Sequence, residues 1–151
     1  MKWVKKDIEQ FKEIEEFVDT IILPLVPFDF FGKEAAKKAL QNEIMTIYVN
    51  EIEQKLKGRI IQFPHYTYLA EGNIEEEVSR INDWIIKNEK EHIKHILLLT
   101  FDSSWRKYEA DLKGTLLWVP AMYSGNIYSE EVSRMMSDQI NELISLIQSY
   151  W

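Results

Sequence analysis

The run Ile96–Phe101 constrains the fold of this chain more than any other stretch. It is almost wholly apolar, shows no alternation, and changes abruptly to Asp102 and Ser103. Such a run is typical of a strand buried on both faces, as in a parallel sheet covered by helices, although a buried helix can show it too. Other short apolar segments, separated by helical patterns, end in proline or polar residues. These neighbours favour the strand.

Helical periodicity alternates with short apolar runs along the whole chain. Helices are expected at residues 5–17, 33–57, 74–90 and 129–149, and strands at 18–27, 59–63, 93–101 and 115–120. This order predicts an α/β fold, a three-layer sandwich in which a four-stranded, mostly parallel sheet carries helices on both faces. The length suits one domain covering residues 1–151.

Two places in this pattern are ambiguous. Pro24 lies inside the first strand pattern and cannot donate to a ladder, so it indicates a sheet edge, a bulge or an early strand end. Residues 102–114 could form a short crossover helix or a hairpin loop. Because a crossover needs about a dozen residues, we favour the hairpin, which would make the last strand antiparallel.

Composition excludes several classes of protein. The formal net charge of −7 disfavours binding to nucleic acid or to an anionic membrane surface. The absence of cysteine excludes disulfides, thiol catalysis and Cys-ligated metals. No signal peptide or membrane span is evident, so a cytoplasmic location is expected. No glycine-rich phosphate loop is present, and no cofactor is predicted.

Polar residues follow the predicted strands, at the sheet edge where open α/β proteins bind ligands. Asp29, His65 and Asp102 would form a carboxylate–imidazole–carboxylate group there, and Ser103 could act as a nucleophile if His65 lay within hydrogen-bond reach. Ordinary loops and turns carry the same residue types. Further candidates for ligand or partner contact are Tyr66, Trp105, Tyr123 and Ser124.

A second pair of candidates is His92 and His95, whose spacing could place two imidazoles on one helical face. The pair straddles the predicted end of a helix and the start of a strand, which favours a solvated helix end. No metal site is predicted from it.

The sequence also resembles the YpiF-like family of short uncharacterised proteins from spore-forming bacilli. The resemblance rests on Met1-Lys2-Trp3, on Val18-Asp19-Thr20 before Leu23-Pro24-Leu25, on Lys57-Gly58-Arg59, and on Phe63-Pro64 before Thr67-Tyr68-Leu69. It implies a cytoplasmic bacterial protein and supplies no catalytic residues.

Two functions are compatible with these observations. The favoured one is a non-enzymatic interaction or ligand-binding domain, because catalytic motifs are missing and aromatic residues are abundant. It would use self-association or a protein partner through Trp3, Phe28, Phe30, Phe31, Trp105, Tyr123, Tyr128 and Trp151. The alternative is a small hydrolase-like or metal-assisted enzyme with its site at the carboxyl ends of the strands.

Overall fold

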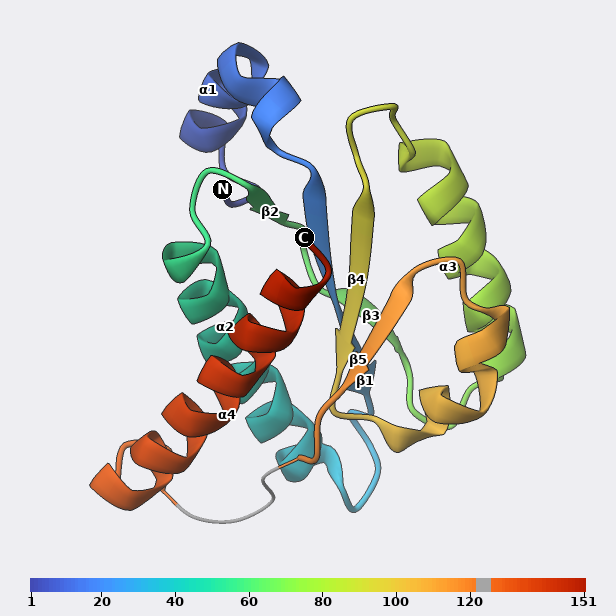
Figure 1. Ribbon diagram of the computed structural model, residues 1–151. Helices are drawn as coiled ribbons and strands as arrows, with labels where there is room; N and C mark the ends of the chain where they lie inside the picture. Colours follow the sequence, from blue (N-terminus) through green and yellow to red (C-terminus); the bar gives the residue numbers. More distant parts are fainter. Residues whose placement is uncertain (122–125) are drawn as a thin grey trace.

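The predicted alternation of helices and strands is present in the computed structural model, which describes residues 1–121 and 126–151 (Figure 1). The helices are α1 (Lys5–Ile14), α2 (Ala35–Lys55), α3 (Ile74–Asn88) and α4 (Glu130–Ser149), with 3₁₀ segments η1 (Glu15–Phe17) and η2 (Ser103–Asp111). The strands are β1 (Thr20–Phe28), β2 (Ile60–Gln62), β3 (Tyr66–Leu69), β4 (His95–Thr100) and β5 (Thr115–Trp118). The α/β prediction is confirmed.

One parallel sheet lies at the centre of the molecule. Its order is β2-β1-β4-β5, and β3 pairs with the far end of β1 beyond β2. The four strand pairings in the described part of the chain are all parallel. The predicted buried run is β4, which lies between β1 and β5.

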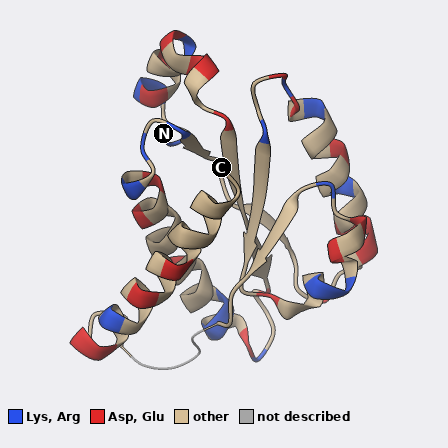
Figure 2. Cartoon of the chain, in the orientation of Figure 1, with Lys and Arg blue, Asp and Glu red and all other residues tan. Residues whose placement is uncertain are grey.

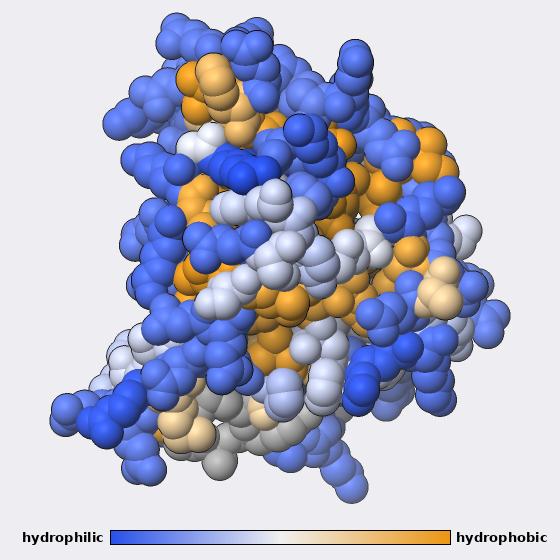
Figure 3. All heavy atoms as spheres, in the orientation of Figure 1, coloured by the Kyte–Doolittle hydropathy of each residue, from blue (hydrophilic) through white to orange (hydrophobic). Residues whose placement is uncertain are grey.

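Helices cover both faces of this sheet and divide the core in two. The helices α2 and α4 pack on one face, where Tyr48 and Ile140 are buried with Leu97 and Leu99 of β4. The helix α3 and the segment η2 pack on the other face, where Ile81 and Trp105 are buried with Leu98. Figure 2 shows charged residues on helices and loops, while the strands contain none. On the face seen in Figure 3, hydrophobic residues show mainly between the hydrophilic helices.

Local signals explain where the helices begin and end. The Asn73 side chain caps α3 by accepting a hydrogen bond from the Glu75 amide at 2.9 Å. Ser129 caps α4 through the Val132 amide at 3.3 Å. After α2, Gly58 adopts a φ of +96°, which L side chains rarely adopt. Side-chain caps thus define the starts of α3 and α4, and a glycine turn follows α2.

The prediction from Pro24 was wrong, because β1 runs through it as an interior strand. The Phe63 amide donates to the Ile22 carbonyl and the Ala70 amide to the Phe28 carbonyl, so the even-numbered residues of β1 face β2 and β3. Pro24 therefore faces that side at the point where β2 has ended and β3 has not begun. Because proline has no N–H to donate, pairing on that side of β1 is broken at Pro24. The break lies in the neighbouring strand, between β2 and β3, and β1 itself continues.

Two further expectations need correction. The strand predicted at residues 59–63 is followed by a second one, β3, so the sheet formed by residues 1–121 and 126–151 has five strands rather than four. The preferred hairpin at residues 102–114 was also wrong. The segment η2 forms a crossover over the α3 face, and β5 is parallel to β4.

Candidate functional site

The loop between β1 and α2 shapes the carboxyl edge of the sheet. Asp29 accepts a hydrogen bond from the Gly32 amide through Oδ1 at 2.7 Å. A Cβ atom at Gly32 would lie 1.7 Å from Asp29 Oδ2, so only glycine is compatible with this arrangement. The carboxylate therefore folds back over its own loop and fixes the residues between Asp29 and Gly32.

That loop presents large apolar side chains to solvent. Phe28, Phe30 and Phe31 are 49%, 69% and 95% exposed, and Leu69 of the adjacent β3 is 67% exposed. The Phe28 and Phe30 ring centroids lie 6.4 Å apart, and those of Phe30 and Phe31 lie 4.9 Å apart. We call these four residues the aromatic edge. Exposed apolar groups gathered in this way are typical of interaction surfaces.

Two hollows adjoin the aromatic edge. The larger, with a volume of about 600 Å³, lies between β1, β3 and the start of α2, and we call it the α2 hollow. Its lining is mostly apolar because Ala35, Ala36 and Ala39 leave space along the helix, while Asp29, Asn42 and Lys38 add polar groups. The smaller, of about 350 Å³, lies on the other side of the loop, between the aromatic edge and residues 69–72.

His65 is joined to the α2 hollow through one hydrogen bond. Its Nδ1 lies 3.0 Å from Oδ1 of Asn42, and an amide oxygen only accepts, so Nδ1 carries the proton. Burial lowers the pKa of His65 below its usual value, which favours the neutral ring. The structure thus connects two predicted residues, Asp29 and His65, to one hollow.

Asp102 has a different environment. Its Oδ2 accepts from the Tyr68 hydroxyl at 2.6 Å, and its Oδ1 accepts from the Ser104 amide at 2.9 Å, which caps η2. Trp105 Nε1 donates to the same Tyr68 oxygen at 2.8 Å. Tyr68 and Trp105 belong to the core on the α3 face. This carboxylate therefore joins β3 to η2 inside the fold.

Trp105, expected to contact a ligand or partner, is fully buried in the core on the α3 face and presents no surface there. The sequence pattern misled because a tryptophan after a strand end suggests a loop, whereas η2 turns it into the core.

Ser103 is exposed at the start of η2. The Tyr66 hydroxyl donates to Glu77 at 2.5 Å. Burial and this carboxylate raise the pKa of Tyr66. Tyr123 and Ser124 lie outside the described residues.

The predicted group of Asp29, His65 and Asp102 is not joined by hydrogen bonds in the described part of the chain. Asp29 bonds within its loop, His65 bonds to Asn42 on the α2 face, and Asp102 bonds to Tyr68 on the α3 face. A catalytic role for these residues stays a prediction.

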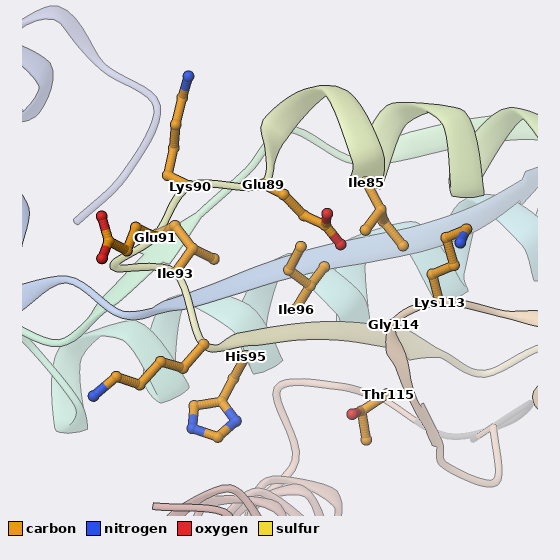
Figure 4. A pocket seen from close by; sticks show the side chains of 11 residues that line it. Ile85, Glu89, Lys90, Glu91, Ile93, His95, Ile96, Lys113, Gly114 and Thr115 are labelled. Atoms are coloured by element: carbon orange, nitrogen blue, oxygen red, sulfur yellow. The ribbon is translucent and has the colours of Figure 1, made fainter.

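The opposite, amino edge of the sheet has a hollow of about 500 Å³ near His95 (Figure 4). It carries both signs of charge, from Glu89 and Glu91 and from Lys90, Lys94 and Lys113. Lys90 and His95 point in opposite directions in Figure 4, so these two side chains do not converge on one ligand atom. The Nε2 atom of His92 lies 3.6 Å from the Oε1 atom of Glu15. Among the described residues, no group of three or more His, Asp or Glu could hold a metal ion.

Sequence reasoning missed the components that give the carboxyl edge its shape. The strand β3 and the small residues Ala35, Ala36 and Ala39 were not recognised as parts of a site. The signal for β3 was the short run Tyr66-Thr67-Tyr68-Leu69, whose aromatic and β-branched residues favour strands. The alanines gave no signal, because in sequence they read as ordinary helix formers.

Comparison with known proteins agrees with the resemblance seen in the sequence. The family described as "Protein of unknown function (DUF2487)" matches residues 9–151. The chain belongs to this family. The uncharacterized protein YpiF of Bacillus subtilis (strain 168) is 24% identical over 154 residues, covering 100% of this chain and 98% of YpiF. No solved structure matches the chain. No helix among the described residues is long and apolar enough to cross a membrane.

Proposed function

We propose that this protein is a non-enzymatic binding domain that receives apolar side chains of another polypeptide at the carboxyl edge of its sheet. The observation that carries the proposal is the aromatic edge, Phe28, Phe30, Phe31 and Leu69, standing over two adjoining hollows. Exposing these groups to water is unfavourable, and covering them with a partner would recover that free energy.

The chemistry of the α2 hollow supports a binding role. It is concave and mostly apolar, with a few polar groups from Asp29, Asn42 and Lys38 at its margin. That combination suits an apolar side chain whose backbone or neighbouring polar atoms are oriented by hydrogen bonds. Aromatic residues are also enriched at protein–protein interfaces. A polypeptide partner uses both the exposed rings and the hollow, whereas a small molecule would use the hollow alone.

The proposal is tested by asking whether the hollow accepts a side-chain analogue. Indole is titrated into ¹⁵N-labelled protein, and amide shifts are followed by NMR. We expect shifts confined to residues 26–42 and 67–72. The variant Ala39→Leu fills the α2 hollow with a residue of good helix propensity, so it should abolish these shifts without unfolding α2.

Ala110→Leu is the matched control, because Ala110 is also exposed and lies in η2, on the other face of the sheet. It should leave the indole shifts unchanged. Shifts scattered over the whole surface, or shifts equally strong in Ala39→Leu, would contradict the proposed site.

A further inference from the structure

The strands β2 and β3 form one edge of the sheet, and an added segment already pairs with the β2 end of that edge. The Met1 amino group donates to the Ile60 carbonyl at 2.8 Å, and the Gln62 amide donates to the Met1 carbonyl at 2.7 Å. Lys2 and Gln62 form a parallel bridge. Residues 1–2 thus pair with the outer edge of β2 as a short extra strand.

The strand β3 continues that edge, but its outer side is open. Because the Ala70 amide donates to Phe28 of β1, the backbone groups of Tyr66 and Tyr68 also face β1, and those of Thr67 and Leu69 face away. The Leu69 carbonyl accepts from the Gly72 amide. The Thr67 N–H, the Thr67 C=O and the Leu69 N–H have no hydrogen-bond partner among the described residues.

The other edge strand differs from β3 in its side chains. In β5, Leu116 and Leu117 are 8% and 3% exposed, so both faces of that strand are buried under the helix layers. In β3, Thr67 is exposed and Leu69 is 67% exposed. Of the two edge strands, β3 is the one with side chains exposed to solvent. An open edge with unpaired backbone groups is a template for strand pairing.

We propose that an extended segment of a basic partner protein adds to β3 as a further strand. This inference rests on the proposed function and specifies how the partner binds. Its backbone would exchange hydrogen bonds with Thr67 and Leu69, as in other cases of strand addition to an exposed sheet edge. Its side chains on the α2 face, alternate along the strand, would enter the α2 hollow beside Thr67, which lines that hollow.

Charge selects the occupant. Asp29 and Glu71 line the smaller hollow, and Glu75 and Glu76 are exposed in the first turn of α3 just beyond β3. A segment with apolar residues at alternate positions, flanked by Lys or Arg, would complement this surface. A second copy of the chain would bring the same acidic groups and its own net charge of −7 against them, which opposes pairing of β3 with β3.

The experiment selects peptides from a random ten-residue library displayed on phage, using the immobilised full-length protein. We expect enrichment of alternating apolar residues next to Lys or Arg. Thr67→Pro removes the outward N–H and leaves pairing with β1 intact, so binding should weaken by about tenfold or more. Thr67→Ala keeps that N–H and is the matched control, expected to bind within about twofold of wild type.

A second measurement uses wild-type protein, so it does not depend on the folding of a variant. Each amide of one selected peptide is N-methylated in turn. Strand addition predicts an alternating pattern, in which methyl groups facing β3 lower affinity by about tenfold and the others are tolerated.

The possible failures are distinguishable. A failure to enrich any peptide, equal binding to Thr67→Pro, or a pattern of N-methylation without alternation would overturn strand addition. Peptides that bind Thr67→Pro normally but lose binding to Ala39→Leu would leave the proposed function standing without this mode. A dimer in light scattering that Thr67→Pro dissociates would make a second copy the occupant and overturn the basic partner. If wild-type protein bound neither a selected peptide nor indole, both proposals would be overturned.

Discussion

At the scale of single residues, Asp102 illustrates how a strand-end carboxylate can serve the fold. The sequence correctly places it just after the buried strand, at the carboxyl edge. What sequence could not supply are its partners, since Tyr68 and Ser104 reach it only because β3 and η2 form. Asp29 and His65 are similar cases. Their positions at strand ends were predictable, but their contacts with Gly32 and Asn42 depend on loop geometry and on the facing helix.

Asp102→Ala should lower the free energy of unfolding by about 1–3 kcal/mol, because it leaves the buried Tyr68 hydroxyl without its acceptor and removes the cap of η2. Urea denaturation followed by tryptophan fluorescence measures this. In the Tyr68→Phe background the same substitution should cost less, because the hydroxyl is already absent. An additive double mutant would show that the two side chains are not coupled.

At the scale of elements, the crossover between β4 and β5 marks the limit of periodicity. Strands and helices with strong apolar patterns were predicted close to their observed bounds. The segment η2 was not, because only Trp105 of its nine residues is buried, too weak a stripe to indicate a helix. The missing information was tertiary. Asn82 of α3 donates to the Asp111 carbonyl at 2.7 Å and accepts from the Lys113 amide at 2.9 Å, which fixes the end of the crossover.

Asn82→Ala should therefore loosen the connection into β5. Losing two hydrogen bonds, each with a small net contribution, should reduce the free energy of unfolding by about 1–3 kcal/mol. Amide exchange at residues 111–115 should become faster, while exchange in α4 stays unchanged. Asn82→Asp keeps the acceptor for the Lys113 amide but sets a carboxylate oxygen against the Asp111 carbonyl, so exchange at residue 113 should stay slower than in Asn82→Ala. Equal exchange rates in wild type and Asn82→Ala would argue against this role.

At the scale of the whole molecule, the sequence determined the layers but not the site. Apolar periodicity reports burial, so it located the sheet and its helices. The carboxyl edge is an exposed surface, and its shape depends on which side chains are small, where β3 starts, and how Asp29 folds over Gly32. None of these features produces a periodic pattern in the sequence. Two ionisable groups, His65 and Asp19, make the stability of the whole fold depend on pH.

Burial holds the pKa of His65 below its ordinary value near 6.5. The unfolded chain therefore binds the proton more readily, and stability falls as pH drops below about 7 towards the folded pKa. Burial alone would raise the pKa of Asp19, but its hydrogen bonds with Arg59 and Thr20 outweigh burial and lower it. The contribution of Asp19 to the free energy of unfolding is present above the pKa that this group has in the unfolded chain, near 4. It is lost as pH falls through the pKa in the folded protein.

The contributions of the two groups begin to fall at different pH values, about 7 for His65 and about 4 for Asp19, so single variants can distinguish them. Urea midpoints are compared at about pH 7.5, 5.5 and 3.5, values that bracket the two ordinary pKa values. His65→Gln should reduce the loss of stability between the first two values, which lie on either side of the ordinary pKa of histidine. Asp19→Asn should be less stable than wild type at the higher values and should reduce only the second step. If His65→Gln kept the full loss between about pH 7.5 and 5.5, burial of the imidazole would not be its source.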